Sequence, residues 1–237
     1  MAVNLATTLA EAKDAKVALL DLNSPVGDAA SYLDLKSQFT FSDALASTSR
    51  LDPMLLESFM TVGHGVAVLP GPKQLKPNEN TPLAASLAKL LRVTAQAYTH
   101  TFIDMPSSLD SDLMRVLAEN SEDVLLVLTP ELPALWRTYR LMVHLNNLGY
   151  RERIKLILNR DNSRDEINEL EIRKSLNYPI YWRLPNNYGS AIAAINKGKP
   201  LAAVNHSGLS SSYRKLTQLL IGIDVTKKRR GFAKLFS

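Results

Sequence analysis

The sequence contains no cysteine among its 237 residues. Without thiols the protein has no disulfide framework, no thiolate nucleophile and no cysteine-based zinc site. It also has no run of about 18 apolar residues, the length that a membrane-spanning helix needs. Both absences are compatible with a reducing compartment, and we expect a cytoplasmic protein.

Acidic residues are absent from the last eleven positions, which carry five lysines and arginines. The net charge of the whole sequence is +5, so the residues before this segment are neutral overall. A neutral body argues against a nucleic-acid-binding face, which needs clustered positive charge. We therefore divide the sequence into a domain at 1–224 and a basic tail at 225–237.

Hydrophobic residues make up 46% of the sequence and charged residues 22%, which is ordinary for a globular domain. Short apolar runs alternate with segments of helical periodicity. This alternation predicts an α/β fold with a doubly wound, mostly parallel sheet and helices on both faces. The predicted strands are 17–20, 66–69, 99–103, 124–128, 154–158 and 180–184. The predicted helices are 2–13, 83–97, 134–148, 165–176, 189–197 and 209–221.

Two of the predicted strands end in polar residues. Asp21 and Asn23 follow the first strand, and Asp104 closes another before Pro106. Ligands bind at the carboxyl ends of strands in open α/β sheets, so these residues are candidates for chemistry. An acid that closes an apolar strand resembles a Walker B segment, whose carboxylate serves Mg²⁺. The structural alternative for Asp21 is a side chain that accepts backbone N–H groups.

Other chemically tempting residues have simpler explanations. His64 lies between two glycines without a metal-ligand partner at suitable spacing, and we expect it in a turn. Asp110 and Asp112 suit a helix N-terminus, where the helix dipole favours negative charge. Trp136 and Tyr139 belong to a predicted helix, and we expect their rings to serve packing rather than form a binding platform.

Taken together, these segments resemble the MinD/ParA group of P-loop ATPases, and most closely its CpaE/TadZ pilus-assembly branch. The resemblance rests on the order and spacing of six stretches across nearly the whole sequence. They are 1–10, 20–34, 68–72 (Val-Leu-Pro-Gly-Pro), 103–106 (Ile-Asp-Met-Pro), 156–160 (Leu-Ile-Leu-Asn-Arg) and 181–186 (Tyr-Trp-Arg-Leu-Pro-Asn).

The resemblance implies a protein that binds ATP with Mg²⁺, forms a homodimer through the nucleotide and helps to localise or assemble a Flp-type or type IV-like pilus. Asp104 would serve the Mg²⁺ shell, and Asp21 with Asn23 would lie near the γ-phosphate. The adenine and ribose would contact residues after two later strands. These residues are Asn159, Arg160, Pro185 and Asn186.

The sequence departs from this family in two ways. No Gly-x-x-x-x-Gly-Lys-Ser/Thr phosphate loop occurs in it, although the family places that loop, with a preceding central strand, just before residue 1. We expect Met1 to be an internal methionine of a longer protein, with a natural nucleotide-free relative as the alternative. Asn23 is neutral where many relatives have a carboxylate, so it cannot act as a base.

These departures have two consequences. Loss of a central strand should leave two neighbouring strands unpaired on their inner edges. Hydrolysis is not expected from these residues alone, so the competing function is a non-catalytic localisation protein with a vestigial nucleotide site. A Rossmann-type cofactor enzyme is disfavoured because no Gly-x-Gly-x-x-Gly follows a strand.

The C-terminal tail is the remaining candidate for function. Its aromatic and leucine residues fall at helical spacing beside basic residues, which is typical of a segment lying on an anionic membrane. It resembles the membrane-targeting helix of MinD, and a disordered basic tail is the alternative. The candidate membrane contacts are Lys227, Lys228, Arg229, Arg230, Phe232, Lys234, Leu235 and Phe236.

Overall fold

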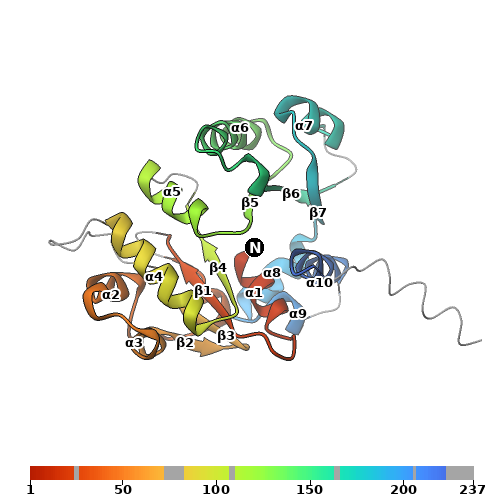
Figure 1. Ribbon diagram of the computed structural model, residues 1–237. Helices are drawn as coiled ribbons and strands as arrows, with labels where there is room; N and C mark the ends of the chain where they lie inside the picture. The colour runs from red at the N-terminus through yellow and green to blue at the C-terminus, as the bar shows by residue number, and fades with distance from the viewer. Residues whose placement is uncertain (24–26, 72–82, 107–109, 163–165, 205–206, 223–237) are drawn as a thin grey trace, which may run out of the picture.

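The structure is a computed structural model of the full sequence. It describes residues 1–23, 27–71, 83–106, 110–162, 166–204 and 207–222 (Figure 1). The tail that we predict to contact a membrane lies outside the described residues.

The strands of the described residues form two separate sheets. The first has the order β2-β3-β1-β4, and only β2 is antiparallel to its neighbour. The second has the order β5-β6-β7 and is parallel throughout. The strands are β1 (Val17–Asp21), β2 (Thr61–Gly63), β3 (Val66–Leu69), β4 (His100–Asp104), β5 (Val124–Leu128), β6 (Ile154–Asp161) and β7 (Ile180–Pro185).

The two sheets meet at strands that have free edges. Among the described residues β4 pairs only with β1, and β5 pairs only with β6, although β4 and β5 are consecutive along the chain. Every residue of β1 and β3 is buried, whereas most of β4 and β5 is only half-buried, and Val127 of β5 is 43% exposed. Apolar strands in a complete parallel sheet are normally covered on both faces. Among the described residues, the inner edges of β4 and β5 are therefore open, as we predicted.

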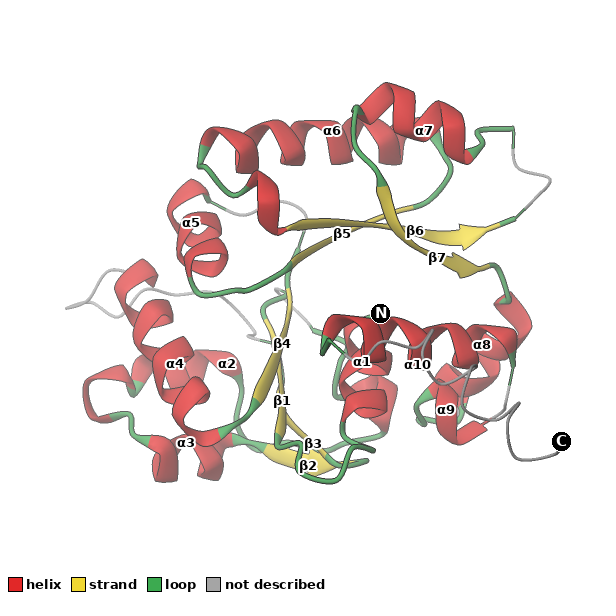
Figure 2. Cartoon of the chain, turned by 45° about the vertical axis from the view of Figure 1, so that its right-hand side comes forward, coloured by secondary structure: helices red, strands yellow, loops and turns green. Residues whose placement is uncertain are grey.

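Helices lie on both faces of the two sheets, as the alternating pattern predicts (Figures 1 and 2). Several begin at a side chain that accepts a backbone N–H group, including Asp52, Asp110, Asn168 and Ser207. The helices are α1 (Ala2–Leu9), α2 (Phe41–Ala46), α3 (Pro53–Phe59), α4 (Leu83–Ala97), α5 (Ser111–Glu119), α6 (Leu132–Asn147), α7 (Glu169–Leu176), α8 (Tyr188–Asn196), α9 (Leu201–Val204) and α10 (Gly208–Leu220).

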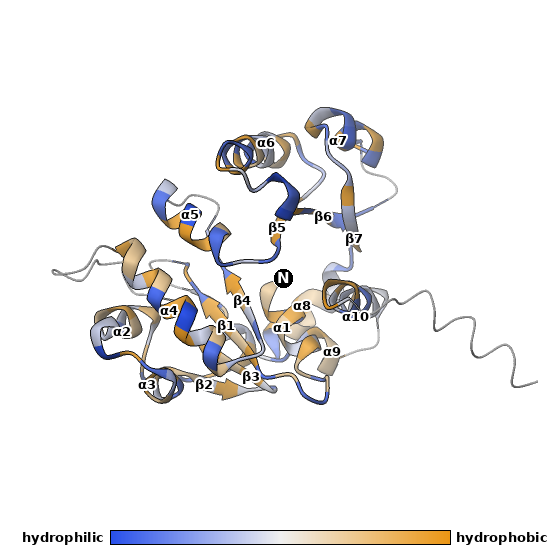
Figure 3. Cartoon of the chain, viewed as in Figure 1, coloured by the Kyte–Doolittle hydropathy of each residue, from blue (hydrophilic) through white to orange (hydrophobic). Residues whose placement is uncertain are grey.

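Most helices cover one of the two sheets. Helices α2 to α5 pack on one face of the first sheet, and α1 packs on the other. Helices α6 and α7 cover the outer face of the second sheet, while α8, α9 and α10 cover its inner face. Hydrophobic colouring concentrates in the strands and in the helices between the sheets (Figure 3).

Helix α1 joins the two halves of the molecule. Val3, Ala6 and Leu9 pack against β1 and β3 of the first sheet. Leu5, on another face of the same helix, packs in a cluster that includes Ile157 of the second sheet. The helix therefore bridges the gap between β4 and β5 with side chains instead of backbone hydrogen bonds.

Candidate functional site

The two candidate carboxylates end neighbouring strands. Asp21 is the register partner of Asp104 in the parallel pairing of β1 with β4. One residue further, the backbone N–H of Leu22 donates to the carbonyl of Asp104 at 2.8 Å. Side chains of register partners lie on the same face of a sheet, so the structure brings the two predicted acids together.

Asp21 is completely buried and its oxygens accept three hydrogen bonds. One oxygen accepts from the backbone and side-chain nitrogens of Asn23, each at 2.9 Å, and the other accepts from the backbone N–H of Ala29 at 3.0 Å. Gly27 covers this carboxylate so closely that a Cβ there would lie 2.2 Å from its Oδ2. The structural alternative for Asp21, a side chain that accepts backbone N–H groups, is therefore present. Asn23 is one of the donors to this carboxylate.

Asp104 lies in a different electrostatic environment. Burial raises the pKa of its carboxyl, Asp21 and Asp28 raise this pKa further, and the N-terminal ammonium group of Met1 lowers it. Burial also lowers the pKa of that terminal amino group. The start of α1 therefore lies beside the acids at the ends of β1 and β4.

The raised pKa of Asp104 predicts that Asp104→Asn stabilises the protein near pH 7. A carboxyl whose pKa is raised by folding stabilises the native state below its ordinary pKa of 3.8, and this contribution is lost as the pH rises through the folded pKa. The amide removes the buried charge that is unfavourable at neutral pH. We expect a rise in Tm of a few degrees, which corresponds to about 1 kcal/mol of free energy of unfolding in a domain of this size.

Thermal unfolding at pH 7 and at pH 3.5 checks this prediction, because the advantage of the amide should vanish at the lower pH. Asp112→Asn is the control, since the Asp112 side chain is 75% exposed. A loss of stability at pH 7 would mean that the attraction between Asp104 and the amino terminus outweighs burial.

The predicted base-binding residues also come together. Asp161 and Pro185 are register partners in β6 and β7, and the N–H of Asn186 donates to the carbonyl of Asp161 at 2.9 Å. Arg160 has a left-handed backbone, with φ at 56°, beside an irregularity in the pairing. Asn159 is half-buried and Arg160 is exposed. The ends of β6 and β7 thus form one exposed polar rim that offers amide and carbonyl groups to a ligand.

Comparison with solved structures places this arrangement in a known fold. A ParA family ATPase from Chlorobium tepidum TLS superposes with a TM-score of 0.83 and 26% identity, covering 92% of this chain and 91% of that chain. MinD of Pyrococcus horikoshii OT3 complexed with Mg-ADP gives a TM-score of 0.73 at 21% identity, covering 95% and 91%. MinD in the MinC:MinD complex of Aquifex aeolicus gives 0.76 at 16% identity, covering 94% and 90%. The chain has the fold of the MinD and ParA ATPases.

No protein-family model matches the sequence, and no curated protein matches it. The identification of the MinD/ParA fold therefore rests on the backbone arrangement and on the position of the strand-end acids. Among the described residues no helix is long and apolar enough to cross a membrane.

The residues fit a nucleotide only in part. The rim at β6 and β7 suits the base, and Asp104 suits a water-mediated Mg²⁺ contact. The sequence has no Gly-rich loop for the phosphates, and the described residues contain no group of three or more His, Cys, Asp or Glu side chains that could hold a metal directly. We therefore derive no phosphoryl-transfer step for these residues.

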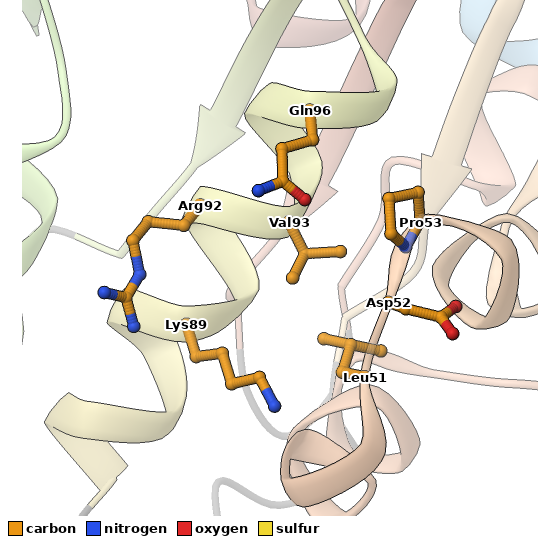
Figure 4. A pocket seen from close by; sticks show the side chains of 7 residues that line it. All are labelled: Leu51, Asp52, Pro53, Lys89, Arg92, Val93 and Gln96. Carbon is orange, nitrogen blue, oxygen red and sulfur yellow. The ribbon is translucent and has the colours of Figure 1, made fainter.

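A pocket that the sequence did not predict lies elsewhere, between α4 and the start of α3 (Figure 4). It is about 380 Å³, and Lys89 at its edge donates to the carbonyl of Ser49 at 3.0 Å. Its lining residues are Leu51, Asp52, Pro53, Lys89, Arg92, Val93 and Gln96. None of these belongs to the strand ends that carry Asp21, Asp104 or Asn159, so the pocket is not part of the candidate nucleotide site.

The structure also shows roles that the sequence analysis missed or misjudged. Asn4 accepts a hydrogen bond from the N–H of Leu201 at 3.0 Å, which ties α1 to α9. His64 lies in the turn between β2 and β3, as predicted. The prediction that Trp136 and Tyr139 serve packing is wrong, because their side chains are 58% and 46% exposed.

Proposed function

We propose that this protein is a MinD/ParA-type module of the CpaE/TadZ kind, which localises or assembles a pilus through nucleotide-dependent dimerisation. The observation that carries the proposal is the side-by-side placement of Asp21 and Asp104 at the start of α1. Two acids and a helix N-terminus at the carboxyl ends of parallel strands are suited to phosphate and Mg²⁺. The same fold is found in MinD complexed with Mg-ADP.

In this proposal the residues keep the roles that the resemblance implies. Asp104 serves the Mg²⁺ shell, and Asp21 orders Asn23 near the γ-phosphate. The rim formed by Asn159, Arg160, Pro185 and Asn186 contacts the base and ribose. The given residues hold no Gly-rich loop for the phosphates, so the phosphate grip is the part of this proposal that the calorimetry below tests. The tail at 225–237 would add a weak, reversible contact with an anionic membrane.

A second candidate is a localisation protein that keeps the fold but no longer responds to nucleotide. One observation favours it. The neutral side chain of Asn23 is engaged in a hydrogen bond with Asp21. Such a protein would use its outer surfaces and its tail rather than ATP.

Calorimetry with ATP and Mg²⁺ distinguishes the two candidates. We would compare residues 1–237 with a version extended by a strand and the loop Lys-Gly-Gly-x-Gly-Lys-Thr immediately before Met1. The proposal expects binding by the extended protein only, with Mg²⁺-dependent tightening that Asp104→Ala abolishes. If neither protein binds ATP, the nucleotide site is vestigial and the second candidate stands.

A further inference from the structure

The pocket between α4 and the start of α3 has an apolar floor and a polar rim (Figure 4). Leu51 and Val93 form the floor and are only 4% and 6% exposed. Lys89, Arg92 and Gln96 supply polar groups around it. The volume of about 380 Å³ lies at the small end of the range of about 300–1,000 Å³ that is found for ligand sites. We call this site the α3–α4 pocket.

One side of α4 forms a wall of the α3–α4 pocket. Lys89, Arg92, Val93 and Gln96 all line it. They are spaced by three, one and three positions, so they lie on the same side of the helix. The pocket therefore combines two cationic side chains, an amide and a buried apolar side chain from a single helical element.

The α3–α4 pocket carries positive charge that no acid neutralises. Helix α4 contains Lys89 and Arg92 but no Asp or Glu. Within the part of the chain that the structure describes, neither cation forms a salt bridge. The carboxylate of Asp52, on the opposite wall, accepts the N–H of Leu55 at 2.8 Å and points away from α4 (Figure 4). An anion in the pocket would therefore meet two cations, while the acid of the wall is engaged elsewhere.

Both cations have hydrogen-bond donors to spare. Lys89 Nζ donates to the carbonyl of Ser49 at 3.0 Å, which uses one of its three N–H groups. The guanidinium of Arg92 is exposed and has no hydrogen-bond partner among the described residues. In Figure 4 the Lys89 amine is directed toward Leu51, whereas the Arg92 guanidinium is directed away from it. Lys89 thus lies in the pocket and Arg92 at its rim.

The wall opposite α4 favours a carboxylate over a phosphate. Phosphate sites are typically built from several free backbone N–H groups. Here the N–H of Leu51 donates to the carbonyl of Thr48 at 3.3 Å, and Pro53 has no N–H. A carboxylate needs fewer donors, and ammonium and guanidinium groups supply strong ones. The apolar floor suits a ligand whose acid group is attached to an apolar body.

We propose that the α3–α4 pocket binds a small organic carboxylate. The acid group lies between Lys89 and Arg92, and the apolar body rests on Leu51, Pro53 and Val93. The pocket is separate from the strand ends that carry Asp21 and Asp104, so this inference does not depend on nucleotide binding.

Nuclear magnetic resonance of the ¹⁵N-labelled protein tests the proposal, with phenylacetate as the probe. We expect amide shifts confined to the neighbourhood of residues 49–53 and 89–96, and weaker binding of acetate, which lacks an apolar body. Neutral phenylacetamide should bind at least about fivefold more weakly than phenylacetate, because it forms no charge-assisted hydrogen bond. The proposal is overturned by an absence of shifts, by shifts elsewhere, by equal affinity for the amide or for acetate, or by tighter binding of phenyl phosphate.

Substitutions of the two cations test where the acid group binds. Arg92→Gln and Lys89→Gln should each weaken phenylacetate binding at least about fivefold and leave phenylacetamide binding unchanged. Arg92→Gln removes no hydrogen bond within the described residues, so its amide spectrum should match that of the wild type away from the pocket. Lys174→Gln on α7 is the control, since Lys174 is exposed, and it should bind phenylacetate as the wild type does. Unchanged affinity for phenylacetate in either pocket variant would contradict the proposal.

Discussion

Asp21→Ala is expected to destabilise the protein by about 3 kcal/mol, because the substitution leaves buried donors without an acceptor. The carboxylate of Asp21 is fully buried and accepts from Asn23 twice and from Ala29 once. Each unsatisfied buried N–H costs about 1–3 kcal/mol, while removal of the buried charge returns part of that cost. Urea unfolding at pH 7, monitored by far-UV circular dichroism, measures the change.

Two variants separate this hydrogen-bond effect from a general loss of charge. Asp21→Asn keeps one carbonyl oxygen for Asn23 but presents an NH₂ group to the N–H of Ala29, so we expect an intermediate loss of about 1–2 kcal/mol. Asp28 is exposed, and Asp28→Ala should change stability by no more than about 0.5 kcal/mol. Equal stability of Asp21→Ala and the wild type would show that these hydrogen bonds contribute nothing.

Much of the fold could be predicted from local patterns. The apolar run after Lys16 and the run before Asp104 become parallel strands, and the strand-end acids become register partners. The fold predicted from alternating strands and helices is the one observed. The expected open edges of β4 and β5 are present, since no strand of the described residues pairs with either inner edge.

Contacts that depend on distant segments could not be predicted in the same way. The closeness of Gly27 to the carboxylate of Asp21 is a contact between residues six positions apart, which local spacing does not reveal. The short strand β2 lacks a long apolar run, and it exists because Thr61–Gly63 pairs antiparallel with β3. Trp136 lies outside the core because the phase of α6 places Leu135 and Met142 on the buried side instead.

The second large effect concerns how the two sheets unfold. Leu5→Ala is expected to cost about 3–4 kcal/mol, because Leu5 is 1% exposed and the substitution leaves a cavity. Leu5 is the residue by which α1 reaches the cluster of Ile157, Leu184 and Leu216 on the second sheet. Since β4 and β5 share no backbone hydrogen bonds, side-chain packing has to couple the sheets. Loss of this packing should make the halves that contain the first and the second sheet unfold at different urea concentrations.

The distribution of tryptophan makes this separation measurable. The only tryptophans are Trp136 and Trp182, and both belong to the half that contains the second sheet. Fluorescence therefore reports that half, while far-UV circular dichroism reports the whole protein. Leu9→Ala is the matched control, since Leu9 is 2% exposed on the same helix but packs with the first sheet. The Leu9→Ala variant should lose a similar free energy of unfolding, while the fluorescence and circular dichroism transitions still coincide. Coincident transitions in Leu5→Ala as well would show that α5, which also contributes to the cores of both sheets, is sufficient to couple them.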